Sequence, residues 1–317
     1  MTLIAALRCY TYSTSLMAQL NVPAVVFCAD SQETAGDFRV EVQKIKPIDA
    51  GSYELIIGGS GNIGALIDGQ TEAIERNVKT WSAGLSETEA RTRLEMVLRG
   101  YNTRHVKDYP ITDPDSKYPE YKAMSFLVCT RDKINSQIYL WKTDATTIST
   151  VGDYALIGWQ EAGYYHHLKW LYRSELTKFR AALIGLQLLR TAQDNLYIGG
   201  PFHVIEVDRD GMRTWPAENV RLLGERAARF NAAVAELLLT FPRLERGEEE
   251  FERFLQQLQE MIRGFRSQQA DLLGDWQDIY RAGIRAEEEY EAREREERKR
   301  IWEAAQKSAS ETPEDVT

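Results

Sequence analysis

Apolar and polar positions in the first two-thirds of the chain alternate between the two-residue period of β-strands and the longer period of amphipathic helices. Runs with the strand pattern cover residues 2–7, 24–29, 40–48, 53–57, 125–129, 137–141, 147–152 and 202–208. Runs with the helical pattern cover residues 65–78, 86–101, 161–173 and 175–195. Strands and helices therefore come in groups, and this order predicts antiparallel sheets covered by helices in place of alternating βαβ units.

The last third of the chain has only the helical pattern. Residues 217–241 predict one helix, ended by Pro242, and residues 248–307 predict a second and longer one. Apolar residues recur every seven positions in the second helix, at Phe251, Leu258, Phe265, Leu272 and Ile279. This heptad stripe is typical of a coiled coil, and it packs either on the chain's own core or on another subunit. The pattern predicts two domains, residues 1–216 and a helical extension at 217–317 with a disordered tail.

The composition narrows the class of protein. The chain has 39 Lys and Arg against 48 Asp and Glu, a net charge of -9, so we expect no nucleic-acid partner. Three cysteines, Cys9, Cys28 and Cys129, form no C-x-x-C pair and are too few for a disulfide framework, which indicates a reducing cytoplasm. We also expect no membrane association and no export, because the sequence has neither a long apolar run nor a signal-peptide pattern.

A glycine-rich stretch raises the question of a nucleotide site. Residues 59–64 read Gly-Ser-Gly-Asn-Ile-Gly, the G-x-G-x-x-G pattern, between a predicted strand and a predicted helix. A dinucleotide site also needs a returning strand that presents an acidic residue to the ribose about 20 residues later, and this sequence continues into another helix. The backbone N–H groups of such a loop can hold an oxyanion instead.

The histidines do not suggest a metal site. His166 and His167 are adjacent in a predicted helix, so they point to different sides, and His105 and His203 are far from them in the sequence. None of the four has metal-ligand spacing, so we expect neither a metal nor another cofactor.

Further stretches carry a resemblance to a known family. The sequence VVFCADSQETAGDF begins at Val25 and VQKIKPID begins at Val42, and both lie between Thr2 and the glycine-rich stretch. The segment A-D-S-x-x-T-A-G is the most specific of these. In this order they resemble the proteasome β-subunit family of N-terminal-nucleophile hydrolases over residues 2–213. The resemblance implies an α+β fold, a four-layer αββα sandwich, ahead of the helical extension.

The resemblance also implies a role for each matching residue. Removal of Met1 would give Thr2 a free α-amine. Thr2 would then be the nucleophile, and that amine would be its general base. Asp30 would orient Lys44, whose ammonium lowers the pKa of the threonine hydroxyl. Lys46 is the alternative lysine, because the segment between Asp30 and Lys44 is slightly shorter than is usual in the family.

Substrate and assembly follow from the same resemblance. Thr34 would position an extended peptide as an added strand, and Gly59 and Gly61 would form the oxyanion loop. The implied activity is a threonine peptidase in a self-compartmentalising homo-oligomeric ring. It would act on peptides or unfolded proteins, with an ATP-dependent unfoldase as a possible partner.

The sequence departs from the family pattern around the amine. A longer connection at residues 11–23 replaces the family's tight hairpin, Trp159 and Ile198 replace serines, and Asn195 replaces an aspartate. Two alternatives to the peptidase therefore stay open. One is a non-catalytic scaffold that retains Met1 and binds partners through the extension, and the other is an amidase acting on small molecules.

Overall fold

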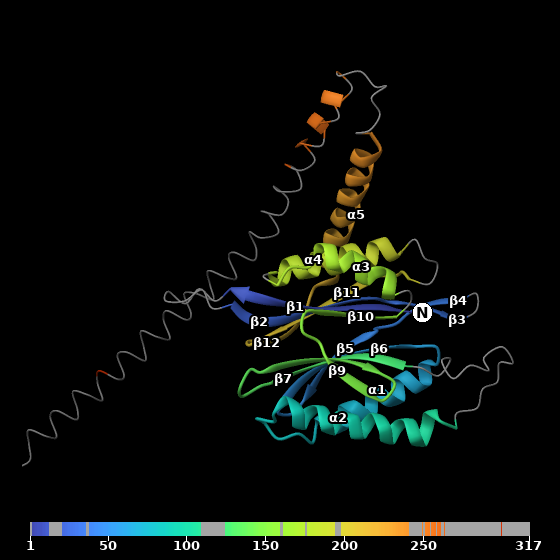
Figure 1. Ribbon diagram of the computed structural model, residues 1–317, viewed down its shortest axis with the longest axis vertical. Coiled ribbons are helices and arrows are strands. Elements are labelled where there is room, and N and C mark those ends of the chain that lie inside the picture. The colour runs from blue at the N-terminus through green and yellow to red at the C-terminus, as the bar shows by residue number, and fades with distance from the viewer. Residues whose placement is uncertain are drawn as a thin grey trace, which may run out of the picture. The chain divides into compact units, whose positions relative to one another are not determined.

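The computed structural model describes residues 2–12, 21–35, 38–108, 124–158, 161–174, 176–193 and 198–240, together with residues 249, 251–253, 255–257, 259, 260, 263 and 299. Contacts between residues divide the chain into two compact units, Met1–Ala235 and Glu236–Thr317, and each is described here by itself. The first unit contains both sheets (Figure 1).

Two five-stranded antiparallel sheets form the centre of the first unit. The first sheet has the order β10 (Tyr154–Gly158), β1 (Leu3–Tyr12), β2 (Asn21–Asp30), β11 (Phe202–Asp208), β12 (Gly211–Thr214). The second has the order β5 (Ile45–Ala50), β6 (Tyr53–Gly61), β7 (Met124–Asp132), β8 (Ile138–Asp144), β9 (Thr147–Thr150). A separate hairpin pairs β3 (Gln32–Ala35) with β4 (Phe38–Glu41).

The helices are grouped as the sequence pattern predicts. They are α1 (Gly64–Val78), α2 (Glu87–Tyr101), the short π-helix η1 (Asn102–Val106), α3 (Glu161–Leu171), α4 (Lys178–Ala192) and α5 (Ala217–Thr240). The predicted mixture of antiparallel sheets and helices is confirmed. A capping box at Ser86 begins α2, since its side chain accepts from the Glu89 N–H and the Glu89 side chain accepts from the Ser86 N–H.

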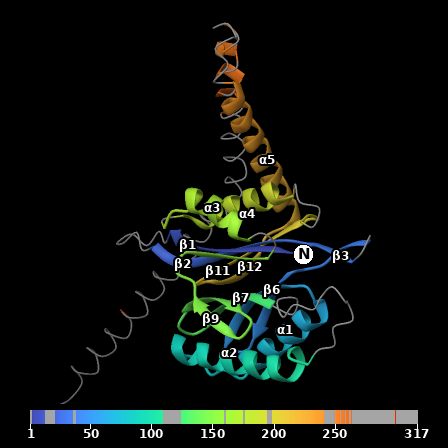
Figure 2. The same ribbon diagram turned by 45° about the vertical axis from the view of Figure 1, so that its right-hand side comes forward.

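Buried apolar residues form three clusters that follow the alternation of each strand. On β1, Leu3 and Ala5 belong to a cluster with α4, whereas Ile4 and Ala6 belong to a cluster with residues of the second sheet. A third cluster joins the other face of the second sheet to α1 and α2. Figure 2 shows α3 and α4 beside the first sheet and α1 and α2 beside the second. The space between the two sheets is therefore closed by side chains from both.

Several strand bounds differ from the prediction. The predicted strand 40–48 is divided between β4 and β5, with residues 42–44 outside both. β1 and β2 still pair at Tyr12 and Asn21, so residues 11, 12 and 21–23 of the predicted connection belong to the hairpin, and its remainder lies outside the described residues. The strand β10 was not predicted. Its five residues pair with β1, so tertiary pairing forms a strand that the local pattern did not indicate.

The predicted extension is only partly covered by the structure. Helix α5 begins at Ala217, the first residue of the predicted extension, while the boundary between the compact units falls after Ala235. Of the heptad stripe, Phe251 is described, and Leu258, Phe265, Leu272 and Ile279 lie outside the described residues. The coiled coil and the domain boundary at residue 216 therefore stay predictions.

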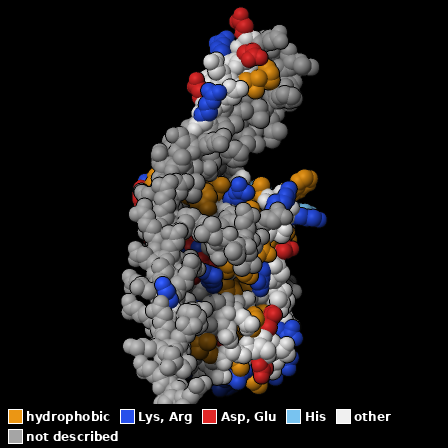
Figure 3. All heavy atoms as spheres, turned by 90° about the vertical axis from the view of Figure 1, so that its left-hand side faces the viewer, with side chains coloured by type: hydrophobic (Ala, Val, Ile, Leu, Met, Phe, Trp, Pro, Cys, Tyr) orange, Lys and Arg blue, Asp and Glu red, His pale blue; other side chains and the backbone are white. Residues whose placement is uncertain are grey.

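Two surface features bear on the expected partners. Among the described helices, none has a segment long and apolar enough to cross a membrane. On the face shown in Figure 3, basic and acidic side chains are interspersed over the described part of the chain.

One buried charge cluster joins α4 to the first sheet. The Lys178 Nζ lies 3.0 Å from Glu206 Oε1 and 2.5 Å from Asp208 Oδ2, and all three side chains are mostly buried. Trp215 Nε1 also donates to Glu206 at 3.0 Å. Burial raises the pKa of Asp208, but the Lys178 ammonium and its hydrogen bond outweigh burial, so the pKa lies below its ordinary value. Lys178 therefore neutralises two carboxylates that the fold has removed from water.

We predict that Lys178→Met lowers the free energy of unfolding by about 3 kcal/mol at neutral pH, because it leaves two buried carboxylates without a cation. Urea denaturation measures the change. The matched control is Lys46→Met, since Lys46 pairs with Asp68 at 3.2 Å on the surface, where such a pair contributes less than about 1 kcal/mol. Equal costs for the two substitutions would contradict the prediction.

The pH dependence gives a second check on the same cluster. A lowered carboxyl pKa stabilises the fold above the ordinary value of 3.8, and this contribution is lost as the pH falls through the lower folded value. The cost of Lys178→Met should therefore be full at neutral pH and should shrink in acid.

Candidate active site

Asp30, the last residue of β2, lies at the centre of the candidate site. Its side chain is completely buried, and it accepts three hydrogen bonds from three different parts of the chain. The Leu3 N–H donates to Oδ1 at 2.9 Å, the Lys44 Nζ donates to Oδ2 at 2.7 Å, and the Gly199 N–H approaches Oδ2 at 3.5 Å. One carboxylate thus fixes the start of β1, the predicted lysine and the turn before β11 relative to one another.

Lys44, not Lys46, is the lysine beside Asp30. It precedes β5, its side chain is only 5% exposed, and its Nζ donates both to Asp30 and to the Gln32 carbonyl oxygen. Lys46 lies two residues further along the chain, on the surface, where it pairs with Asp68. The structure therefore brings Asp30 and Lys44 together and places Lys46 elsewhere.

Burial and charge act in opposite directions on Asp30. Burial raises the pKa of its carboxyl, while the Lys44 ammonium and the Leu3 and Gly199 N–H groups lower it, and the net pKa lies above its ordinary value. Such a pair contributes little net stability, because desolvation offsets its attraction. Its effect is geometric, since a buried ammonium cannot leave its carboxylate without exposing an uncompensated charge.

Thr2 is held through its backbone next to this pair. Its neighbour Leu3 pairs with Gly158 at the end of β10, and Gly158 has a φ of +120°. A Cβ at position 158 would lie 1.8 Å from the Thr2 carbonyl oxygen, so only glycine fits. Figure 1 marks the N-terminus beside the β3–β4 hairpin, at the end of the sheets where these contacts lie. Thr2 itself is half-buried and directly precedes β1.

The sequence pattern predicts a loop at Gly59 and Gly61. In the structure both residues lie in strand β6. They pair with Phe126 and Met124 of β7, and the pairing of β6 with β5 stops one position earlier, at Gly58 and Ile45. Continuing that register by one position brings Lys44 beside Gly59. The predicted loop became strand because β7 offers a pairing partner that the local sequence does not reveal.

The direction of the Gly59 backbone follows from its neighbours. The Phe126 N–H donates to Thr143 Oγ1 on β8 at 3.0 Å, so Phe126 directs its N–H away from β6. Its pair with Gly59 is then a non-hydrogen-bonded pair, in which both residues point their backbone groups outward. The Gly59 N–H therefore points to the side of β6 on which Lys44 lies, and Gly61, of the same parity, points the same way.

Of the four other residues that the sequence analysis singled out, the structure describes two. Thr34 lies in β3 opposite Arg39, in the hairpin that continues directly from Asp30. Ile198 is 3% exposed and belongs to the apolar cluster on the α4 side of the first sheet. Trp159 and Asn195 lie outside the described residues. The site therefore has no hydroxyl at position 198, in agreement with the departure seen in the sequence.

Sequence reasoning did not find two backbone contributors. The Gln32 carbonyl accepts from Lys44, and the Gly199 carbonyl accepts the N–H groups of Ser31 and Gln32 at 3.2 and 2.9 Å. A carbonyl contact leaves no trace in residue type, so nothing in the sequence indicated Gln32. Gly199 directly follows Ile198, which stands where the family has a serine, but no role was predicted for Gly199 itself.

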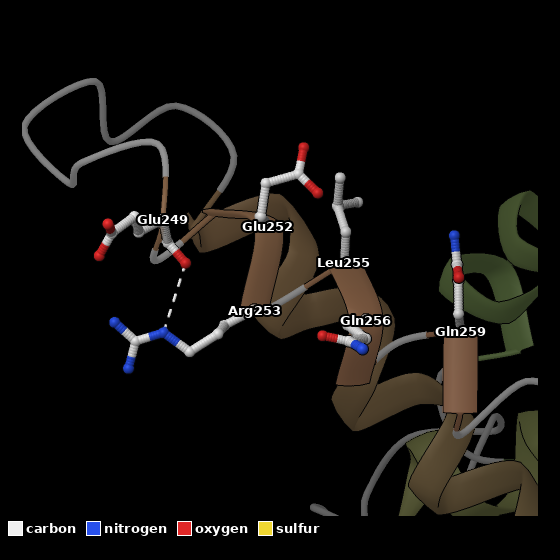
Figure 4. Close-up of a pocket in the computed structure, with 6 residues that line it drawn as sticks. All are labelled: Glu249, Glu252, Arg253, Leu255, Gln256 and Gln259. Atoms are coloured by element: carbon white, nitrogen blue, oxygen red, sulfur yellow. Dashed lines mark hydrogen bonds between the residues drawn. The ribbon is translucent and has the colours of Figure 1, made fainter.

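Metal and small-molecule sites have little support among the described residues. No group of three or more His, Cys, Asp or Glu side chains in this part of the chain could hold a metal ion. A hollow in the second unit, drawn in Figure 4, is lined by residues of one short segment: Glu249, Glu252, Arg253, Leu255, Gln256 and Gln259. Its one drawn hydrogen bond joins Arg253 Nε to the Glu249 carbonyl oxygen, at 3.3 Å, and it brings no reactive group together.

The three cysteines are poor alternatives to Thr2 as nucleophile. Cys9, Cys28 and Cys129 are all buried. Burial raises the pKa of Cys9 and of Cys129 to about 12, and it raises the pKa of Cys28 further. Because the thiolate is the reactive form, these thiols are inert at neutral pH.

We predict that Gly158→Ala lowers the free energy of unfolding by more than about 2 kcal/mol, because the new Cβ overlaps the Thr2 carbonyl and the φ is strained. Thermal or urea unfolding measures the change. Gly152→Ala is the control, since a Cβ there meets nothing within 4 Å. If both variants unfold like the wild type, Gly158 does not hold the Thr2 backbone.

We also predict that the native protein does not react with Ellman's reagent at neutral pH, because all three thiols are buried and protonated. The same reagent should titrate all 3 cysteines after denaturation in guanidinium. Rapid reaction of any thiol in the native state would overturn the assignment.

Comparisons with known proteins give the fold. No protein-family model and no curated protein matches the sequence. Among solved structures, Anbu (ancestral beta-subunit) from Yersinia bercovieri matches with a TM-score of 0.55 and 16% identity, over 78% of this chain and 99% of that one. Anbu from Hyphomicrobium sp. strain MC1 matches with a TM-score of 0.54 and 17% identity, over 78% and 100%. The Anbu (Gly-1) mutant from the same strain matches at 0.54 and 16%, over the same shares. The chain is thus similar in fold to Anbu, a β-subunit relative, at low sequence identity.

Proposed function

We propose that the protein is a threonine peptidase of the N-terminal-nucleophile type, built on a four-layer αββα sandwich, with Thr2 as its nucleophile after removal of Met1. The observation that carries the proposal is the buried Asp30 carboxylate. It binds the backbone N–H next to Thr2 at 2.9 Å and the Lys44 ammonium at 2.7 Å. The likeness in fold to Anbu supports the same conclusion.

In the proposed mechanism the free amine of Thr2 takes the proton of its own hydroxyl. An α-amine has a pKa of about 7.7–8.0, so a useful fraction is unprotonated near neutral pH. The buried Lys44 ammonium favours the alkoxide and lowers the pKa of the hydroxyl. Asp30 keeps that ammonium charged and in place.

The chemical step is an acyl transfer. The Thr2 oxygen forms a bond to the carbonyl carbon of the substrate, and the resulting oxyanion receives the Gly59 N–H, with Gly61 on the same side of the strand. The tetrahedral intermediate collapses, the C–N bond breaks, and the leaving amine takes the proton held by the Thr2 amine. Water then hydrolyses the ester and regenerates the threonine.

Substrate binding and assembly are the finer parts of the proposal. An extended peptide would add as a strand beside Thr34 in β3, through its backbone groups. A homo-oligomeric ring would enclose the site, the C-terminal extension would supply contacts between subunits or to an unfoldase, and the protein would act in the cytoplasm. Nucleic acid, membrane and cofactor have no part in this proposal.

A non-catalytic scaffold is the second candidate, and one observation favours it. Ile198 is buried among apolar residues where the family has a serine that contacts the amine. The amine of Thr2 would then lack part of its support, and Met1 would remain attached. The protein would bind partners through the extension in that case.

We predict that intact-mass measurement shows Met1 removed and that a β-lactone or boronate probe labels Thr2. Thr2→Ala should abolish labelling. Asp30→Asn and Lys44→Met should each slow it by at least about 100-fold, the usual contribution of general acid–base groups. Lys46→Met is the matched control and should label at the wild-type rate, because that lysine pairs with Asp68 on the surface.

The outcomes separate the candidates. Retention of Met1 with no labelling would exclude both the peptidase and the small-molecule amidase and leave the scaffold. Labelling with cleavage of small amides but not of unfolded protein would identify an amidase. The buried cysteines keep a label at Thr2 from being confused with a thiol adduct.

A further inference from the structure

Ser31 carries a buried hydroxyl that nothing in the fold explains. The residue is 0% exposed, and within the described chain its Oγ has no hydrogen-bond partner. A buried hydroxyl without a partner costs free energy. Both backbone groups of Ser31 have hydrogen-bond partners. Its N–H donates to the Gly199 carbonyl, and its carbonyl accepts from the Val42 N–H at 2.8 Å.

The end of the β1–β2 pair brings Ser31 and Thr2 to the same end of the first sheet. β1 and β2 pair as far as Ile4 and Ala29, so Thr2 and Ser31 each lie two residues beyond the last paired position. The hydrogen bond from the Leu3 N–H to the Asp30 carboxylate lies between these positions and shows that the two strands are still adjacent. Thr2 and Ser31 are the chain neighbours of Leu3 and Asp30, so this hydrogen bond keeps them at the same end of the sheet.

The Ser31 hydroxyl lies against Gly200. A Cβ on Gly200 would lie 2.6 Å from the Ser31 Oγ, and Gly200 has a φ of +76°, so glycine leaves that side open. The hydroxyl can rotate among the staggered positions of χ1. On the other side of the Gly199–Gly200 turn, Ile198 packs into the apolar cluster and offers no hydroxyl.

We propose that the Ser31 hydroxyl is a positioning group for the amine of Thr2. This inference rests on the proposed function. Once Met1 is removed, the Ser31 Oγ accepts a hydrogen bond from that amine and directs the nitrogen lone pair toward the Thr2 hydroxyl. Ser31 thereby supplies the hydroxyl contact that position 198 has lost.

The proposal has a consequence for pH dependence. A hydroxyl oxygen binds a charged ammonium more strongly than a neutral amine, so it favours the protonated form. The titratable side chains on the neighbouring described segments are Asp30 on β2, Lys44 ahead of β5, and His203, which lies opposite Ala29 on β11. All three are the same with and without the hydroxyl, so a shift on its removal reports Ser31 alone.

The test compares Ser31→Ala with Thr130→Val. Thr130 is also 0% exposed with an unpartnered Oγ1, and it lies on β7, where its neighbours in register are Leu55 and Tyr139. Each substitution removes one unsatisfied buried hydroxyl, so neither should lower the melting temperature. The rate of β-lactone labelling is measured from about pH 6 to about pH 9, a range that brackets the amine pKa, after intact mass has shown that Met1 is removed.

We predict that Ser31→Ala labels about 10-fold more slowly at its optimum, because the amine is no longer oriented. The acid limb of its pH profile should also move to lower pH, while Thr130→Val keeps the wild-type rate and profile. A wild-type rate and profile for Ser31→Ala would overturn the inference and leave the peptidase intact. Failure of the wild type itself to label would overturn the peptidase and, with it, this inference.

Discussion

The fold of the first unit depends at one end on a single buried carboxylate. Asp30 takes the place of a backbone carbonyl opposite Leu3, so the pairing of β1 with β2 ends in a side chain instead of continuing. The same group holds Lys44 ahead of β5, which belongs to the other sheet. The two sheets are therefore tied by an ion pair in addition to the apolar cluster between them.

The buried pair of Asp30 and Lys44 adds little stability, but it fixes the positions of both side chains. Desolvation raises the pKa of Asp30, which means that burial disfavours the charged form of its carboxyl group. A hydrophobic pair of the same volume would often be at least as stable, so the contribution of the ion pair is to the position of its groups and not to stability. The cluster of Lys178 with Glu206 and Asp208 differs, since there the cation prevails over burial and the pKa of Asp208 is lowered.

The sequence predicted those helices and strands that depend on the pattern of neighbouring residues. The helix that ends at Tyr101, the helix that ends at Val78 and the strand from Phe202 to Asp208 all follow from a short window of residues. The pairing of Asp30 with a lysine also came from a local motif, through a family resemblance. The choice between Lys44 and Lys46 did not, because it depends on where β5 begins, and the predicted strand ran through both.

What the sequence did not predict is set by contacts between distant segments. Strand β10 exists because β1 offers it a partner, and β6 extends through its glycines because β7 does. The Gln32 carbonyl and the Gly199 backbone act without their side chains, so residue type holds no record of them. Most of the heptad stripe lies outside the described residues and stays a prediction from periodicity.

The outward direction of the Gly59 N–H has a consequence for what the site depends on. A donor supplied by the main chain does not depend on the chemistry of the side chain at its own position, although proline has no N–H and a Cβ at position 59 would lie 2.5 Å from Ile67 Cγ2. A contribution from a side chain depends on residue type, and position 198 carries Ile where the family that the sequence resembles has a serine. In the proposed mechanism the oxyanion donor therefore depends on the path of strand β6, whereas support of the amine depends on which side chains surround it.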